Sequence, residues 1–225
     1  MELNDTTINI LKNYATINPN IVINEGNQLK TISNARNVLS TSEVNVDFPQ
    51  TFGIYDLNEF LNVLSLVDEP RLRFEKEYVV VGDATGRSSV KYFFSDPEML
   101  TSPANSINMP DPEVKFTLDS DTLKKVKRAA AALGHDEISI TPVTGAIRLS
   151  VLDSKDATSN NYSIDVEGDY PDVKFQFILN VGNLKVVNED FEVGISSKLI
   201  SMFKSKQSTT EYYIALEKSS TYGEA

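Results

Sequence analysis

The chain has 225 residues, 40% of them hydrophobic and 24% charged, and its 32 acidic residues against 21 Lys and Arg give a net charge of −11. This length and composition are typical of a globular protein with one large or two small domains, each able to bury a core. The absence of cysteine excludes disulfides, thiolate metal sites and cysteine nucleophiles, and the single histidine, His135, excludes metal sites that need several imidazoles.

The N-terminal segment predicts neither an export signal nor a membrane anchor. Residues 1–13 lack a basic region followed by a continuous apolar stretch. No apolar run in the sequence approaches the roughly 18 residues that span a bilayer. We therefore expect a soluble chain in a reducing compartment.

Hydrophobic periodicity predicts that the first part of the chain alternates helices with strands. Residues 5–17 form a helix with Ile8, Leu11 and Ala15 on one face, after an N-cap at Asn4 or Asp5. Residues 20–48 alternate as an antiparallel meander. A second helix over 56–67, capped by Asp56, has one apolar side made of Leu57, Phe60, Leu61 and Leu64. Three strands are expected next, over 71–77, 78–83 and 88–94.

A break in composition separates this part from the rest. Residues 95–111 contain Pro97, Pro103 and Pro110 together with several serines and asparagines, as linkers do. We predict an N-terminal domain over 1–95, a linker over 96–111 and a C-terminal domain over 112–225.

The same order of elements returns after the linker. A strand over 114–118 and a helix over 120–133 precede strands over 137–143, 146–153, 161–168 and 174–180. A short helix over 181–187 and strands over 191–197, 197–205 and 211–218 complete the pattern. The four expected helix caps, Asn4, Asp56, Asp119 and Asn180, are 52, 63 and 61 residues apart. This spacing favours four repeated units of helix plus meander, paired into two domains.

The third helix carries a concentrated positive charge. Lys124, Lys125, Lys127 and Arg128 place four positive charges within five residues of an acidic chain. A helical wheel places Leu123, Val126, Ala130 and Leu133 on the buried face and Lys124, Lys125 and Arg128 nearly opposite. The stripe is either a surface that follows nucleic-acid phosphates or an ordinary solvated helix face. The nucleic-acid interpretation is extended by Lys12 on the first helix and Lys185 on the fourth. The exposed faces of the first two helices otherwise carry neutral side chains that would not repel phosphate, namely Asn9, Asn13, Asn58 and Asn62.

No catalytic constellation emerges from the sequence. The segment 82–87 superficially resembles a phosphate loop, but it lacks the terminal GK[ST] and a following helix, so a tight turn is the better interpretation. The acidic segment 167–172 matches no calcium loop and is better explained as a surface loop. His135 follows Gly134 at the end of the basic helix, which favours a capping role. We expect no enzymatic activity, no cofactor and no metal.

Five segments, DTTINILKNYATIN, GIYDLNEFLNVLSLV, EISITPVTGAIRL, FQFILNVGNLKV and YYIALE, resemble the DNA polymerase sliding clamps of large tailed bacteriophages. The resemblance extends over essentially the whole chain. It implies an α+β fold of two topologically similar clamp domains in a head-to-tail homotrimer. Antiparallel sheets would form the outside, and four short helices per chain would line a bore that encircles duplex DNA.

The resemblance also implies a function and partners. The protein would hold the phage replicative DNA polymerase on duplex DNA without sequence specificity, after an ATP-dependent clamp loader opens the ring, in the cytoplasm of the infected bacterium. Edge strands at 88–94 and 160–166 would join neighbouring subunits. A structural virion or scaffold oligomer is the alternative, although it gives the basic helix face no role.

Two sets of site residues follow. The DNA-contacting set is Lys124, Lys125 and Arg128, with weaker candidates Lys127, Lys12 and Lys185. By resemblance, a pocket for the peptide tails of polymerase and other replication proteins would be formed by Val38, Met99, Leu100, Pro103, Ile214, Ala215 and Leu216.

Overall fold

A computed structural model describes residues 1–83, 85–104, 107–156 and 158–223 of the chain. The chain divides into two compact units, 1–106 and 107–225, and the boundary falls within the segment expected to be a linker. Residues 105 and 106 of that segment, and residue 84 of the expected tight turn, lie outside the described residues. No helix in the described part of the chain is long and apolar enough to cross a membrane.

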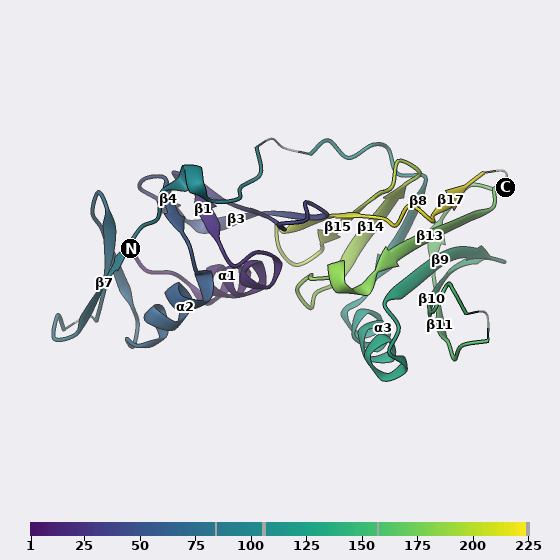
Figure 1. The fold of residues 1–225 in the computed structure, drawn as a ribbon, viewed down its shortest axis with the longest axis horizontal. Coiled ribbons are helices and arrows are strands. Elements are labelled where there is room, and N and C mark those ends of the chain that lie inside the picture. The colour runs from purple at the N-terminus through teal and green to yellow at the C-terminus, as the bar shows by residue number, and fades with distance from the viewer. Residues whose placement is uncertain (84, 105–106, 157, 224–225) are drawn as a thin grey trace. The chain divides into compact units, whose positions relative to one another are not determined.

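The first unit alternates helices and strands in nearly the expected order (Figure 1). Its elements are α1 (Asp5–Ile17), β1 (Ile21–Ile23), β2 (Gly26–Ile32), β3 (Val38–Phe48), β4 (Phe52–Ile54), α2 (Leu57–Ser65), β5 (Arg71–Phe74), β6 (Tyr78–Gly82), β7 (Ser89–Phe93) and the 3-10 helix η1 (Pro97–Met99). All strand pairs among them are antiparallel: β1 with β4, β2 with β3, and β6 with both β5 and β7.

Both helices of this unit begin at the residues that the sequence indicates. The side chain of Asn4 accepts a hydrogen bond from the Thr7 amide, and that of Asp56 accepts from the amides of Asn58 and Glu59. These bonds satisfy amides that a helix start otherwise leaves without partners. The two helices then pack against each other.

The buried face of α1 differs from the expected one. Leu11 is fully buried, but Ile8 and Ala15 are only half-buried, whereas Ile10 and Tyr14 lie in the core. The tyrosine ring reaches the sheet, where its hydroxyl oxygen accepts a hydrogen bond from Ser40 on β3. This long-range partner rotates the packed face away from the stripe that periodicity alone predicts.

Aromatic packing joins the small β5–β7 sheet to the rest of the first unit. The rings of Phe48, Phe52, Phe74 and Phe94 form a cluster with centroid separations between 4.7 and 6.4 Å. Gly53 lies beside this cluster, and its carbonyl accepts a hydrogen bond from the Ser95 amide. A Cβ at Gly53 would lie 2.5 Å from the Ser95 carbonyl oxygen, so glycine is needed for the chain after β7 to approach β4.

The second unit is a sandwich of antiparallel strands covered by one long helix. Its elements are β8 (Val114–Leu118), α3 (Ser120–Leu133), β9 (Glu137–Val143), β10 (Ala146–Leu152), β11 (Tyr162–Val166), β12 (Gly168–Asp169), β13 (Phe175–Asn180), the 3-10 helix η2 (Val181–Asn183), β14 (Phe191–Ser196), β15 (Ile200–Ser205), β16 (Glu211–Ala215) and β17 (Thr221–Tyr222). The strand orders are β11-β10-β9-β13-β17 in one sheet and β12-β8-β14-β15-β16 in the other. Buried side chains from both sheets, including Leu149 and Phe203, meet Leu123 and Val126 of α3.

The fourth expected helix is only a single 3-10 turn. Asn180 caps it as predicted, because its side chain accepts a hydrogen bond from the Gly182 amide. The turn ends at Asn183, however, and residues 184–187 form neither helix nor strand. Gly182, Asn183 and the neighbouring valines are all poor helix formers, which explains why an amphipathic spacing did not produce a helix here. The described part of the chain therefore has three α-helices in place of the four expected, and the α+β class is retained.

The cap of α3 gives a test of this local structure. Replacing Asp119 by Ala should lower the free energy of unfolding by ~1 kcal/mol, because Asp119 accepts hydrogen bonds from the amide and hydroxyl of Thr122. Asp119→Asn should keep the cap at neutral pH. Urea unfolding of both variants measures the difference, and an unchanged Asp119→Ala variant would contradict a stabilising cap.

The same cap should depend on pH in a defined direction. The Thr122 amide is the main cause that lowers the pKa of Asp119 below its usual value. A carboxyl with a lower pKa in the folded state contributes its stability above the unfolded-state pKa and loses it as pH falls through the folded-state pKa. The stability difference between the parent and Asp119→Asn should therefore change only in acid.

Candidate nucleic-acid interface

The basic side of α3 is exposed as the wheel predicts. Lys124, Lys125 and Arg128 are exposed, while Leu123 and Val126 on the opposite side are buried. Gly134 ends the helix with a positive φ of 69°, a conformation that glycine adopts without strain. Exposed Ala131 and Ala132 complete this face and leave room beside the cations.

Lys124, one of these three cations, forms a weak ion pair with a neighbouring side chain. The Lys124 Nζ lies 3.6 Å from a carboxylate oxygen of Asp121, with both side chains more than half exposed to solvent. Exposed pairs of this kind contribute little to stability and exchange readily with other anions. Lys124 can therefore turn to a phosphate at small cost.

Lys127 has a different role from its neighbours. Its ammonium is partly buried and donates a hydrogen bond of 3.3 Å to the carbonyl oxygen of Val186, and burial lowers its pKa. The bond attaches α3 to the segment that follows η2. Lys127 is therefore better placed to anchor the helix than to contact a ligand.

Lys185 lies close in sequence to this attachment point. It is exposed, as a DNA-contacting residue must be, but it follows η2 and is not on a helix. The prediction that Lys185 lies on a fourth helix is therefore wrong. Because the Lys127 ammonium bonds the next residue, Val186, the backbone at Lys185 is held near α3.

The helices of the first unit present mainly neutral groups. Lys12 and Asn9 are exposed on α1, and Asn58 and Asn62 are exposed on α2. Glu59 is also exposed on α2 and places a negative charge beside these neutral groups. It lies near the Tyr92 hydroxyl, and burial together with Glu59 and Asp56 raises the pKa of Tyr92 to about 12.

The residues expected to form a peptide pocket differ in exposure. Val38 on β3 and Ile214 on β16 lie in the cores of their own units, and Leu216 after β16 is also buried. Leu100, Pro103 and Ala215 are half-buried. Met99, at the end of η1, is 84% exposed. Met99 is thus the member of this set with the most apolar surface open to a partner.

His135 and Asp83, two residues that the sequence singles out, both have structural partners in the described part of the chain. The described residues include no group of three or more His, Asp or Glu side chains that could hold a metal ion. One ring nitrogen of His135 lies 2.7 Å from the carbonyl oxygen of Asn160, so the imidazole links the end of α3 to the segment before β11. Asp83 holds the turn after β6, where its carboxylate accepts hydrogen bonds from Thr85, Arg87 and Ser88.

Comparisons with known proteins agree with this geometry. Residues 4–85 match the family model described as DNA polymerase processivity factor, and residues 115–218 match the model described as gp45 sliding clamp, C terminal. The sliding clamp of Vibrio phage KVP40 is 34% identical over 96% of this chain and 99% of its own length. That of Enterobacteria phage T4 is 30% identical over 99% of both chains.

Solved structures show the same fold at low sequence identity. PCNA from Thermococcus kodakaraensis superposes with a TM-score of 0.71 at 16% identity, covering 94% of this chain and 96% of its own. Proliferating cellular nuclear antigen from Entamoeba histolytica gives a TM-score of 0.69 at 12% identity over 93% and 94% of the two chains. The fold, the exposed basic helix and the phage relatives together show that the chain belongs to the sliding-clamp family, the ring-forming, non-catalytic processivity factors that hold DNA polymerase on DNA.

Proposed function

We propose that this sliding clamp closes as a head-to-tail homotrimer around duplex DNA, after an ATP-dependent clamp loader opens it, in the cytoplasm of an infected bacterium. The observation that carries the proposal is the exposed basic side of α3 in a chain of net charge −11. A sliding ring needs positive charge where DNA passes and little attraction elsewhere. A trimer would carry three times this negative charge, so duplex outside the ring would be repelled.

Lys124, Lys125 and Arg128 are proposed to make the principal contacts with phosphates. Lysine and arginine attract any sequence equally when they meet the backbone, because phosphates carry no sequence information. Lys12 and Lys185 are secondary candidates on other elements. Contacts of this kind exchange quickly, so the ring can move along DNA while its closed topology prevents it from leaving.

Ring closure is proposed to use the free sheet edges. β7 is one of the two outer strands of the β5–β7 sheet, and β11 is one of the two outer strands of the five-stranded sheet. They lie within segments 88–94 and 160–166, the subunit contacts that the family resemblance implies. An uncovered edge presents unpaired backbone N–H and C=O groups, which a strand of another copy can satisfy. A contact between two different surfaces can close into a ring when the rotation per subunit fits.

Peptide tails of the polymerase, the clamp loader and other replication proteins are proposed to bind at Met99, Leu100 and Pro103. Met99 contributes exposed apolar surface, and the two neighbouring residues are half-buried. Val38 is buried in the core of the first unit, Ile214 and Leu216 are buried in the core of the second, and Ala215 is half-buried. Met99 would therefore supply the main apolar contact to a bound peptide.

The test is the length of polymerase products on a primed circular template. Long products should appear only when this protein, the cognate polymerase, its loader and ATP are all present. Linearising the template should shorten the products, because a ring can slide off a free end. Equal product lengths with and without the protein would contradict the proposal and favour a structural oligomer.

A further inference from the structure

The segment that enters β8 is attached to β14 at two neighbouring points. The ring of Pro112 lies against Gly194, where an added Cβ would come within 3.0 Å of the proline side chain. The carboxylate of Glu113 accepts two hydrogen bonds from Ser197, one of 2.9 Å from the amide and one of 2.6 Å from the hydroxyl. Because Glu113 and Ser197 are 84 residues apart in sequence, only the folded sheet brings them together.

Ser197 begins the tight turn that joins β14 to β15. Ser196 and Ile200 are paired across this hairpin, so residues 197–199 form its loop. The Leu199 amide donates a hydrogen bond of 3.1 Å to the Ser196 carbonyl, and Leu199 has a φ of 61°. Glycine or asparagine usually occupies this left-handed position, which strains the backbone of a leucine. The turn must therefore be held by contacts with the rest of the unit, and the bonds at Ser197 supply two of them.

The same turn is attached to the end of β16, where two residues of the proposed peptide set lie. The Leu199 carbonyl accepts a hydrogen bond of 3.0 Å from the Leu216 amide, and Ile200 lies opposite Ala215 in the β15–β16 ladder. Leu199, Ile200 and Ala215 are each half-buried and together present apolar surface at this end of the sheet. The position of that surface therefore depends on the turn over 197–199.

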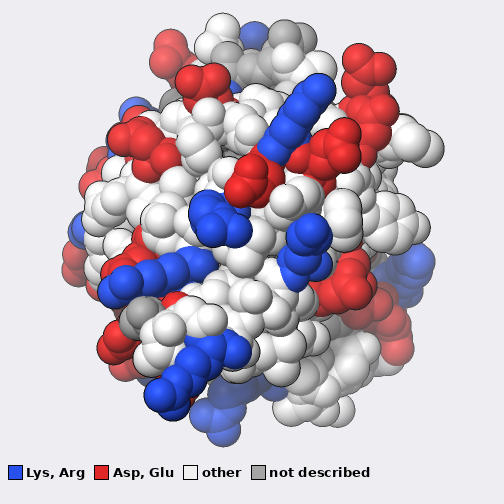
Figure 2. Space-filling view, turned by 90° about the vertical axis from the view of Figure 1, so that its left-hand side faces the viewer, with Lys and Arg blue, Asp and Glu red and all other residues white. Residues whose placement is uncertain are grey.

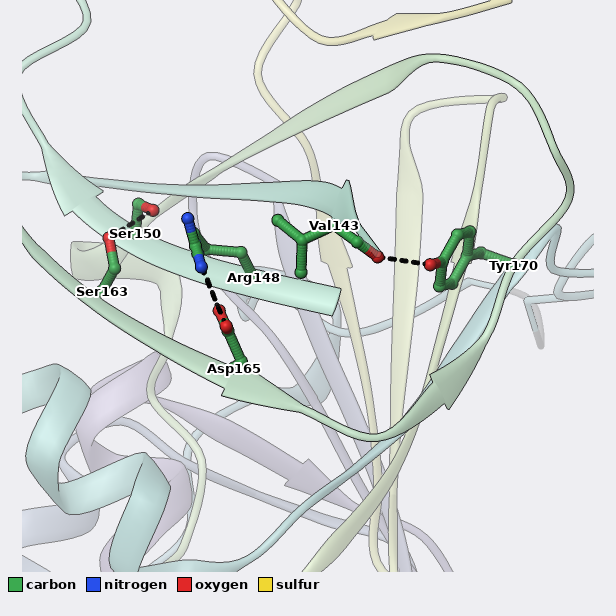
Figure 3. Close-up of polar contacts among 6 residues, drawn as sticks. All are labelled: Val143, Arg148, Ser150, Ser163, Asp165 and Tyr170. Carbon is green, nitrogen blue, oxygen red and sulfur yellow. Dashed lines mark hydrogen bonds and ion pairs between the residues drawn. The ribbon is translucent and has the colours of Figure 1, made fainter. Parts of the chain in front are cut away.

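Glu113 differs from other acidic side chains in the feature that it holds. Acidic and basic side chains are interspersed on the face drawn in Figure 2, so surface charge alone does not mark a site. Asp165 accepts hydrogen bonds of 2.7 and 2.9 Å from Arg148, and this pair joins β10 to β11, which already share a backbone ladder (Figure 3). Glu113 instead bonds the loop of a hairpin. Burial, the largest influence on its carboxyl, would raise the pKa of Glu113, but hydrogen bonds from Ser197 and Ser196 lower it overall, so the group stays ionised and accepts both bonds.

We infer that Glu113 is a positioning residue of the peptide site, because its bonds to Ser197 fix the turn that carries the apolar surface beside Ala215. This role rests on the proposed peptide site and adds to it a residue that a bound peptide need not touch. Without the carboxylate, residues 197–199 would have to be ordered as the peptide binds. That ordering reduces the free energy gained on binding, whereas a turn already held in place needs no further ordering.

Peptide affinity tests this role. Glu113→Ala is expected to weaken binding of a fluorescently labelled peptide of the cognate polymerase tail about tenfold, the effect of ordering one or two further side chains. Ser197→Ala removes only the hydroxyl donor and should weaken binding less. The double variant should bind as Glu113→Ala alone does, because both substitutions break the same contact. Glu113→Gln keeps one acceptor oxygen and should recover part of the affinity.

Asp111→Ala is the matched control for charge. Asp111 is exposed and lies two residues before Glu113, so its removal changes the net charge by the same amount and leaves the Ser197 bonds in place. This variant should keep the affinity of the natural clamp.

A fluorescent probe in the turn distinguishes positioning from general stability. The natural chain contains no tryptophan, so Lys198→Trp at this exposed position introduces a single indole. Adding Glu113→Ala should lower the fluorescence anisotropy of that indole in the absence of peptide, because the turn then moves more freely. Adding Asp111→Ala should leave the anisotropy unchanged. Urea unfolding of each variant measures global stability separately.

Each outcome supports or overturns the positioning role. Unchanged affinity in a folded Glu113→Ala clamp would overturn it and keep the peptide site. Equal losses in Glu113→Ala and Asp111→Ala would overturn it in favour of a charge effect. Should Glu113→Ala fail to fold, Ser197→Ala decides, and unchanged affinity in that variant would overturn the role. A natural clamp that does not bind the peptide would overturn the peptide site on which the role rests.

Discussion

Reversing the charge of Lys124, Lys125 and Arg128 together, each to Glu, is expected to abolish retention of the clamp on DNA and shorten polymerase products while the protein stays folded. All three side chains are exposed, and none lies in the core of the second unit. The change removes three cations and adds three anions where phosphates would pass. Each lost phosphate contact should reduce the slope of log affinity against log salt by ~0.9. Retention on nicked circular DNA at several salt concentrations measures this effect.

A matched variant separates local charge from total charge. Lys174, Lys198 and Lys218 are also exposed in the second unit, and replacing them by Glu changes the net charge of the chain by the same amount. This control should keep long products and nearly normal retention. Equal losses in both variants would show that net charge, rather than the α3 face, controls DNA retention. Sedimentation and circular dichroism of both variants would exclude loss of the ring or of the fold.

Local physics explains which parts of the fold the sequence predicts. Asn4, Asp56 and Asp119 cap helices through hydrogen bonds to amides only two or three residues away, so short-range pattern is sufficient. The segment after Asn180 has the same cap and the same apolar spacing. Gly182 and Asn183 reduce it to one turn, because poor helix formers outweigh amphipathic spacing in a segment this short.

Long-range contacts explain what the sequence does not predict about the site. Lys127 belongs to the basic run, but its partner is the Val186 carbonyl, 59 residues away in sequence. The exposed face of α3 follows from periodicity within one helix, so Lys124, Lys125 and Arg128 could be selected from the sequence. Distinguishing an anchoring lysine from a free one required the position of a second segment.

Exposure is equally difficult to derive for apolar residues. Leu216 and Met99 are both plausible members of a peptide pocket when only residue type is known. The structure places Leu216 in the core at 6% exposure and leaves Met99 84% exposed. Placing Glu at position 216 would bury an unpaired carboxylate, so a loss of peptide binding there could reflect unfolding. A decisive substitution must be made at an exposed residue.

Replacing Met99 by Glu is therefore expected to weaken binding of the cognate polymerase tail peptide by about 30-fold, the size of an interface hot spot of ~2 kcal/mol. The folded clamp should keep its stability, because the side chain makes little contact with its own core. Fluorescence anisotropy with the labelled peptide measures the affinity. Val173→Glu is the matched control, since Val173 is an exposed apolar residue in the second unit. Unchanged affinity in a stable Met99→Glu ring would remove Met99 from the peptide site, whereas equal losses in both variants would indicate a nonspecific charge effect.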